Sequence, residues 1–299
     1  MKHILLDSAY YQKWKSYSTL KESSIRTYTR ELKKFEKFII QCGYTGTLNF
    51  DKFYYYEPSD EYAPINENFI DQYIVYLREE LGASNHMLYD NIVYLRNFFG
   101  FLYDMRMIQH NPVAYYPNPY YERKIIDRSL SEEQCKRMLQ AAVILDPFFR
   151  QYHVLLHLLL ITGLRTREVI SLTMYQIDLE RKVIYVDEGQ KTSANVVYIS
   201  NSLCDDLRRY LSHPTFQAWV EKGNTQVFFQ NQKPFTDDGI NKLIKKISER
   251  AGIERPVTVY TFRHTMAYLM QKAGSDISII QRQLRHQMVS TTIRYLPPV

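Results

Sequence analysis

Apolar side chains recur at helical spacing in three segments near the start of the chain. Ser24 and Ser84 are suited to cap the first and third segments, and Gly43 and Gly82 to end the first and second. The pattern predicts three amphipathic helices, bounded by about residues 24–43, 66–81 and 84–112. We therefore predict an all-α domain over residues 1–112.

A stiff, polar, proline-containing stretch at residues 113–128 follows and predicts an interdomain linker. A second domain is expected over residues 129–299, where Ser131 is suited to cap a new helix and a strongly apolar helix follows at 148–162. Short β-type runs then alternate with helical segments, at 182–186, 196–199 and 227–230. The whole pattern predicts a mainly α fold with a small β-sheet, an all-α domain followed by an α+β domain.

Composition is that of a soluble intracellular protein. Of the 299 residues, 45% are hydrophobic, which is enough for two cores. No run of about 18 apolar residues occurs, and the apolar segment at the start is too short for a signal peptide. The three cysteines lie far apart and lack the spacing of metal ligands, which predicts reduced core thiols and no metal site.

Positive charge is concentrated in the second domain. Residues 129–299 carry 22 Lys and Arg against 16 Asp and Glu, whereas residues 1–112 carry 13 against 14. A polyanionic partner is one interpretation, because each neutralised phosphate releases counterions, and a merely soluble basic protein is the other. The polar face of the first predicted helix holds five cations that either contact DNA or form a solvated face: Arg26, Arg30, Lys33, Lys34 and Lys37.

Five side chains suited to phosphate chemistry occur in order along the second domain. Arg165 lies in TGLRTREV, Lys191 in the loop between two predicted strands, and Arg263 in YTFRHT. His286 lies in LRHQMVSTTIRY, and Tyr295 follows nine positions later. This order and spacing resemble the tyrosine recombinases, the family of phage integrases and Xer-type recombinases, over essentially the whole chain. The resemblance implies a SAM-like helical core-binding domain before an α+β catalytic domain.

Cleavage of a phosphodiester accounts for these residue types. The guanidiniums of Arg165 and Arg263 can hold the non-bridging oxygens as negative charge gathers on them. Tyr295 is expected to attack phosphorus and form a 3′-phosphotyrosine. By resemblance, Lys191 gives a proton to the departing 5′-oxygen, and His286 hydrogen-bonds the phosphate or the tyrosine oxygen. This chemistry needs no metal, no cofactor and no ATP.

Two further residues are candidates for the site. Glu168 lies one helical turn after Arg165 and either orients the cations of the site or is an exposed helix carboxylate. Tyr260 occupies a position where the family usually has a histidine. An unperturbed phenol titrates near pH 10 and is a poor base at neutral pH, so general-base assistance from Tyr260 is in question.

Three other features depart from the family pattern or follow from it. His264 points about 100° away from Arg263 on a helix and is expected to have a buried structural role. Arg285 replaces the glycine that usually precedes the family's histidine, and either contacts a DNA phosphate or points to solvent. Only residues 296–299 follow Tyr295, so any cyclic linking of subunits is expected to use another segment.

The sequence thus predicts a site-specific DNA recombinase, a minimal Xer-like or transposon-encoded resolvase or integrase. It is expected to bind double-stranded DNA as a homo-tetramer, and to be a monomer or dimer when free. A type IB topoisomerase-like relaxing enzyme shares the tyrosine chemistry, although the predicted core-binding domain argues against it. A DNA-binding regulatory relative with weakened cleavage is the third interpretation, because of Tyr260. The expected location is the cytoplasm of a prokaryote, with nucleoid or plasmid DNA and away from membranes.

Overall fold

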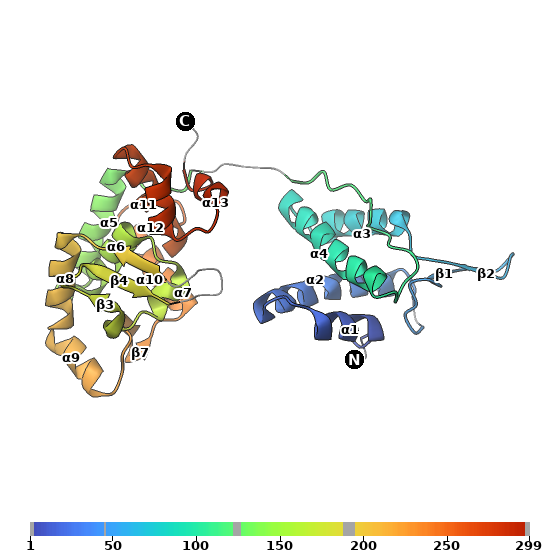
Figure 1. Cartoon of the computed structure of the whole chain (residues 1–299), viewed down its shortest axis with the longest axis horizontal. Coiled ribbons are helices and arrows are strands. Elements are labelled where there is room, and N and C mark those ends of the chain that lie inside the picture. Colours follow the sequence, from blue (N-terminus) through green and yellow to red (C-terminus); the bar gives the residue numbers. More distant parts are fainter. Residues whose placement is uncertain (1–2, 45, 122–126, 188–194, 297–299) are drawn as a thin grey trace. The chain divides into compact units, whose positions relative to one another are not determined.

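The computed structural model describes residues 3–44, 46–121, 127–187 and 195–296. The chain forms two compact units, residues 1–124 and 125–299, and each has its own hydrophobic core (Figure 1). The fold is mainly helical with small antiparallel sheets, which confirms the predicted fold class. Among the described helices, none has both the length and the apolar character that a bilayer crossing requires.

The N-terminal unit packs its helices around an aromatic-rich core. The described helices of this unit are α1 (Ala9–Tyr17), α2 (Glu22–Gln41), α3 (Glu67–Glu79) and α4 (Asn85–Asp104). Helix α2 buries Leu32, Phe35 and Ile39 on one face, at the spacing of three and four residues that a helix requires. The side chains of Asn66 and Ser84 accept hydrogen bonds from the first-turn backbone N–H groups of α3 and α4. These caps define where the two helices begin.

Two features differ from the expected all-α domain and its linker. Strands β1 (Tyr54–Tyr56) and β2 (Glu61–Ala63) pair antiparallel between the first two of the predicted helices, where no strand was expected. Aromatic residues favour extended structure, and the facing rings of Tyr55 and Tyr62 contact each other across the pair. Val113 and Tyr116 lie in the expected linker but are buried in the core of this unit. The packed part of the unit therefore extends beyond residue 112.

The C-terminal unit combines helices with two small sheets. Its described helices are α5 (Glu132–Leu145), α6 (Gln151–Thr162), α7 (Thr166–Ile170), η1 (Met174–Gln176, a 3₁₀ turn), α8 (Asn201–Leu211), α9 (Pro214–Glu221), α10 (Asp237–Arg250), α11 (Val259–Lys272), α12 (Ile277–Leu284) and α13 (Val289–Ile293). Its described strands are β3 (Ile177–Asp178), β4 (Val183–Val186), β5 (Asn195–Tyr198), β6 (Phe229–Gln230) and β7 (Lys233–Pro234). The three-stranded sheet has the order β3-β4-β5, with Ile184 of β4 opposite both Ile177 and Val197.

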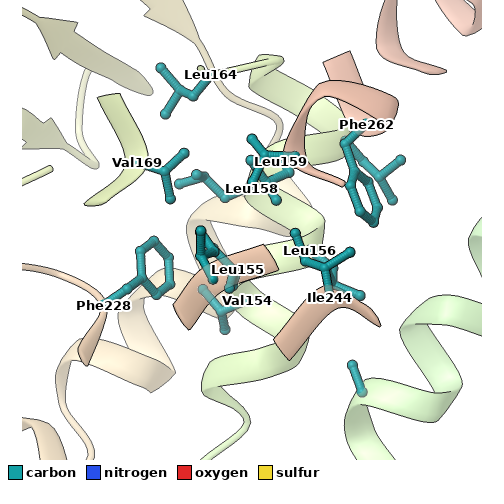
Figure 2. Packing of buried hydrophobic residues seen from close by; sticks show 14 of the residues in the cluster. Val154, Leu155, Leu156, Leu158, Leu159, Leu164, Val169, Phe228, Ile244 and Phe262 are labelled. Atoms are coloured by element: carbon teal, nitrogen blue, oxygen red, sulfur yellow. The ribbon is translucent and has the colours of Figure 1, made fainter. Parts of the chain in front are cut away.

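Helix α6 lies at the centre of the core of the C-terminal unit. It packs against α5, α8 and α11, and half of its 12 side chains are buried apolar groups. Figure 2 shows these side chains packed with Phe228, Ile244 and Phe262, which come from distant parts of the sequence. Cys135 and Cys204 are buried free thiols, whereas Cys42, which was also expected in a core, is exposed at the end of α2. Because neighbours hold α6 on several sides, the segment after its end has a defined position.

Gly163 ends α6 in the left-handed conformation, with φ of 57°. A Cβ atom at this position would lie 2.5 Å from Cε of Met266 on α11. The left-handed backbone therefore favours glycine, and any larger residue would also force the flexible end of the Met266 side chain to shift. The turn leads into α7, and Arg165 occupies the N-cap position of that helix. The Thr-Gly-Leu-Arg sequence thus sets the position of Arg165 relative to α11.

Candidate active site

Arg263 is the buried centre of the candidate site, and only 1% of its surface is exposed. Its guanidinium donates hydrogen bonds to the backbone carbonyls of Gly163 and Leu284. It also donates to Nε2 of His286, at 3.0 Å. Burial and the neighbouring Arg165 lower the pKa of Arg263 to about 10, which leaves the group charged at neutral pH. One fixed cation therefore joins the ends of α6 and α12.

His286 is held as a neutral ring in a defined tautomer. Because Nε2 accepts the hydrogen bond from Arg263, the proton of the neutral ring lies on Nδ1, which is 3.0 Å from Oγ1 of Thr292. Burial and the cations Arg263 and Arg165 lower the pKa of His286 to about 3. At neutral pH this ring orients Arg263 and adds no positive charge of its own.

Tyr295 follows α13, and 9% of its surface is exposed. Its ring stacks on that of His264 with a centroid distance of 4.3 Å. The ring centroids of His286 and Tyr260 lie 4.9 Å and 5.4 Å from that of Tyr295. Cζ of Arg263 lies 5.5 Å from the centre of the Tyr295 ring, within the range of a cation–π contact. The fold thus gathers these side chains from α11, the loop after α12 and the segment that follows α13.

Tyr260 and His264, one turn apart on α11, both contact Tyr295. Burial and a hydrogen bond with Tyr295 raise the pKa of Tyr260 above that of a free phenol, so its hydroxyl stays protonated at neutral pH. His264 is buried, as expected, but it lies against Tyr295 and not apart from the site. Burial, with Arg128 and Arg263 nearby, lowers the pKa of His264 to about 4.

Glu168 joins two arginines of the cluster. Its Oε2 accepts hydrogen bonds from the backbone N–H of Arg165 and from Nη2 of Arg285, both at 2.7 Å. Its Oε1 accepts from Nη1 of Arg165 at 2.9 Å. Burial alone would raise the pKa of Glu168, but Arg285 and Arg165 outweigh burial and lower it. The side chain is buried, which excludes the exposed-carboxylate interpretation and leaves the orienting one.

Arg285 does not lie where the sequence suggested. It ends α12 in the left-handed conformation, with φ of 55°, and 1% of its side chain is exposed. Its guanidinium is engaged by Glu168 and, at 2.9 Å, by the backbone carbonyl of Gln283. The structure therefore supports neither of the expected placements, a DNA-phosphate contact or exposure to solvent. The left-handed backbone explains why glycine suits this position, and the ion pair explains how arginine is accommodated.

The five cations expected on α2 do not form one uniform surface. Arg30 and Lys34 pair with the buried Glu31, at 2.8 Å and 2.6 Å, and so neutralise a carboxylate inside the N-terminal unit. Arg26 pairs with Glu22 on the surface, at 3.5 Å. Four of the cations are exposed, Arg26, Arg30, Lys33 and Lys37, and of these four Arg30 is the one that pairs with Glu31.

Lys191 lies outside the residues that the structure describes.

Two contacts inside the site were not predicted from the sequence. Oγ1 of Thr292 accepts a hydrogen bond from Nδ1–H of His286, and a threonine six positions further along the chain carries no signal of this contact. The stacking of His264 on Tyr295 had one available signal, which is that His264 is adjacent to Arg263.

The charges of the cluster favour an anionic ligand. Arg165, Arg263 and Arg285 bring three cations, and among the described residues Glu168 is the carboxylate that pairs with them. The imidazoles are neutral, so the described residues of the cluster together carry a net positive charge. Buried positive charge is unfavourable unless an anion lies near it. A phosphate that accepts hydrogen bonds from the guanidinium groups would supply this anion.

Comparison with known proteins identifies the family. Residues 128–298 match the phage integrase family. The chain is 26% identical over 264 residues to tyrosine recombinase XerC 2 of Ralstonia nicotianae, and the match covers 87% of this chain and 73% of that protein. It is 26% identical over 278 residues to tyrosine recombinase XerD of Staphylococcus haemolyticus, with 92% and 88% covered.

Solved structures share the fold. The Tn1549 transposon integrase in complex with transposon right end DNA has a TM-score of 0.72 and 15% identity, with 100% of this chain and 96% of that chain covered. The XerH site-specific recombinase bound to a difH substrate has a TM-score of 0.69 and 17% identity, with 91% and 75% covered. The family match spans more than half of the chain and includes all the residues of the arginine, histidine and tyrosine cluster. The chain belongs to the phage integrase family and is a tyrosine recombinase.

Proposed function

We propose that this tyrosine recombinase cuts and rejoins double-stranded DNA at specific sites, with Tyr295 as the nucleophile. The phenol oxygen attacks phosphorus and the bond from phosphorus to the 5′-oxygen breaks, which leaves a 3′-phosphotyrosine and a free 5′-hydroxyl. The 5′-hydroxyl of a second strand then reverses the step and releases the tyrosine. The observation that carries the proposal is the packing of Tyr295 against Arg263 and His286 in a cluster with excess positive charge.

Arg165 and Arg263 are proposed to bind the non-bridging oxygens of the scissile phosphate. Both are held by bonds within the protein before any ligand binds, Arg165 by Glu168 and Arg263 by two carbonyls and His286. Donors that are already oriented stabilise a transition state more than donors that must reorganise, and losing one typically costs about 100- to 1,000-fold in rate. Glu168 is a positioning residue in this proposal.

A proton donor is proposed for the departing 5′-oxygen, and a positioning role is proposed for a histidine beside the nucleophile. Lys191 is assigned to the departing 5′-oxygen by family resemblance alone. For the proton that Tyr295 releases, Tyr260 is a poor acceptor, because its own hydroxyl stays protonated at neutral pH. His264 is neutral, stacks on Tyr295 and hydrogen-bonds its backbone, which supports a role in placing the nucleophile.

The proposed partner is a DNA duplex, bound by a homo-tetramer during exchange and by a monomer or dimer before it. Solved structures of similar fold, such as the Tn1549 integrase and XerH, contain DNA, which supports the partner. The exposed Lys33 and Lys37 on α2 are the proposed phosphate contacts of the N-terminal unit. The bacterial origin of the relatives supports a place of action in the prokaryotic cytoplasm, on nucleoid or plasmid DNA.

A nicked suicide substrate tests the proposal. Footprinting on DNA that flanks the gene would supply the site, and a nick beside the scissile phosphate would trap the covalent complex. Wild type and Tyr260→Phe are expected to form a protein–DNA adduct, and Tyr295→Phe is expected to bind without forming one. An adduct in Tyr295→Phe would place the nucleophile elsewhere.

Two outcomes would favour the other interpretations. Tight binding by wild type without any adduct would indicate a regulatory DNA-binding protein. Relaxation of supercoils without recombinant products, from a plasmid that carries two sites, would indicate a topoisomerase-like enzyme. Recombinant products would exclude both.

A further inference from the structure

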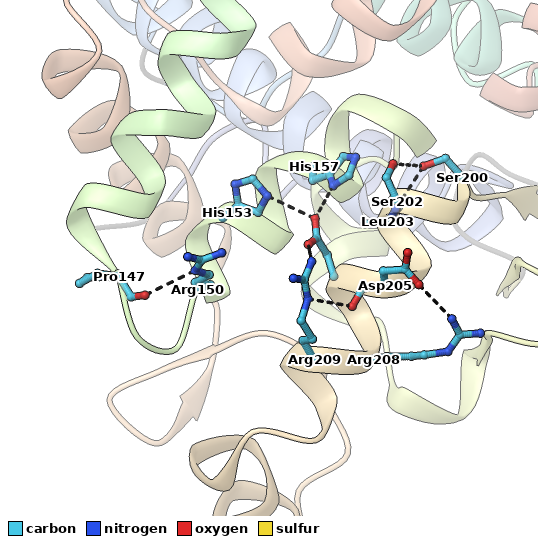
Figure 3. Close-up of polar contacts among 11 residues, drawn as sticks. Pro147, Arg150, His153, His157, Ser200, Ser202, Leu203, Asp205, Arg208 and Arg209 are labelled. Atoms are coloured by element: carbon cyan, nitrogen blue, oxygen red, sulfur yellow. Dashed lines mark hydrogen bonds and ion pairs between the residues drawn. The ribbon is translucent and has the colours of Figure 1, made fainter.

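A second cluster of polar side chains lies between α6 and α8. His153 and His157 are one turn apart on α6, and Asp206 reaches them from α8 (Figure 3). Oδ2 of Asp206 is 2.8 Å from Nδ1 of His157 and 3.2 Å from Nε2 of His153. The donor atoms of the three residues all lie within 4.8 Å of one another. His153 lies about 15 Å along the helix from Gly163, so this cluster is separate from the arginine cluster.

We propose that His153, His157 and Asp206 bind one divalent transition-metal ion, of which Zn²⁺ suits the donor set best. Two imidazoles and one carboxylate are common ligands of zinc and leave a fourth position for water. Donors placed about 2.0–2.1 Å from a tetrahedral ion lie roughly 3.3 Å from one another. The donor distances of 2.8 Å and 3.2 Å to Asp206 thus need only a few tenths of an ångström of spreading, which side-chain rotation can supply.

The surroundings of the three side chains favour an ion. Nη2 of Arg209 donates to Oδ1 of Asp206 at 2.6 Å, which leaves Oδ2 to the two imidazoles. Carboxylates that ligate metals are often held in this way through other hydrogen bonds. A cavity of about 310 Å³ is lined by His153, Asp206, Arg209 and His213, among others, and gives an ion access from solvent. The positive charges of Arg209 and Arg150, which also line the cavity, oppose the ion and reduce its affinity.

The two imidazoles of this cluster are directed at the same atom. Both rings converge on one oxygen atom of Asp206. A shared metal ion accounts for two imidazoles that point at the same oxygen. Because α6 continues into Gly163 and Arg165, an ion that joins α6 to α8 stabilises the support of the arginine cluster and takes no part in the chemistry.

The test is direct metal binding by the full chain, without DNA. After removal of metals with a chelator, the protein is titrated with Zn²⁺ in a calorimeter and with Co²⁺ in a spectrophotometer. We expect one equivalent of each ion to bind, the Co²⁺ complex to show ligand-field absorption of a four-coordinate site, and the melting temperature to rise with Zn²⁺. Absence of binding by the folded wild type would overturn the proposal.

Substitutions locate the site. His153→Gln and His157→Gln can still donate a hydrogen bond to Asp206 but lose the imidazole ligand, so each should weaken Zn²⁺ binding at least about tenfold. The control is His86→Gln, which removes an exposed histidine of the N-terminal unit and should leave binding unchanged. Equal affinity in wild type and both α6 variants would place the ion elsewhere and overturn the proposal. If either variant melts without cooperativity, the paramagnetic shifts of the His153 and His157 ring protons in Co²⁺-loaded wild type decide, because they report these two rings without any substitution; rings without such shifts would overturn the proposal.

Discussion

At the scale of single residues, two buried neutral histidines make stability depend on pH. The pKa of His286 is lowered to about 3 and that of His264 to about 4, mainly by burial. In the unfolded chain both rings take up protons below about pH 6.5. The unfolded state thus binds more protons than the native state between pH 6.5 and these lowered values. The free energy of unfolding should therefore fall as the pH drops through this window, and these rings contribute no such change above it.

Substitution of His264 tests this dependence. A ring that stays neutral in the fold has a pKa near 6.5 in the unfolded chain. It therefore lowers the free energy of unfolding by about 2 kcal/mol when the pH falls from 7.5 to 5. Urea unfolding of His264→Gln should lose less stability between pH 7.5 and pH 5 than wild type does. His86→Gln, on an exposed surface, should behave like wild type. An equal loss in all three proteins would contradict the inference that His264 is neutral in the fold.

Replacement of Arg285 by glycine has two opposing effects on stability, and their magnitudes decide whether the variant is more or less stable. In Arg285→Gly the left-handed backbone loses its strain, a gain of about 1–2 kcal/mol. The same change removes one partner of the buried Glu168, and breaking a buried pair costs about 3–5 kcal/mol. Chemical denaturation should show a net loss of at least about 1 kcal/mol. The exposed Arg282→Ala is the control and should change stability little. A more stable Arg285→Gly would show that the ion pair contributes less than the strain.

At the scale of elements, the turn between α6 and α7 depends on glycine in two ways. Gly163 and Gly274 both have positive φ, but a Cβ on Gly163 would meet Met266 at 2.5 Å, whereas a Cβ on Gly274 would have no heavy atom within 4 Å. Gly274→Ala should cost about 1 kcal/mol for the backbone alone. Gly163→Ala should cost about 1 kcal/mol more, because Cε of the buried Met266 side chain must shift to make room, and should slow DNA cleavage. Thermal unfolding and the suicide-substrate assay measure the two effects, and equal costs would contradict the packing argument.

Helix α2 carries cations of two kinds, and DNA binding should separate them. Lys33 and Lys37 are exposed, whereas Lys34 pairs with the buried Glu31. The double variant Lys33→Ala/Lys37→Ala should lower the slope of log affinity against log salt by about 2, with unchanged thermal stability. Lys34→Ala should lower thermal stability and change the slope less. A salt slope identical to wild type in the double variant would remove α2 from the proposed DNA interface.

At the scale of the whole molecule, long apolar stripes and phosphate-binding motifs are readable from sequence, and contacts between distant segments are not. The stripe of Leu32, Phe35 and Ile39 predicted α2, because one face of a helix must be buried. Helix α1 was not predicted, since only Tyr11 and Trp14 of its residues are buried. The placement of Arg285 depends on Glu168, 117 positions away, and on a left-handed backbone, and neither shows in local spacing.

The three bonds of Arg263 also bear on how the protein meets its ligand. The side chain is anchored to Gly163, Leu284 and His286 within the folded chain. The side chain therefore loses its conformational entropy once, during folding, and does not lose it again when a ligand binds. Searching along many kilobases of DNA then carries no repeated entropic penalty at this side chain, because the proposed phosphate donor is already oriented before the target arrives.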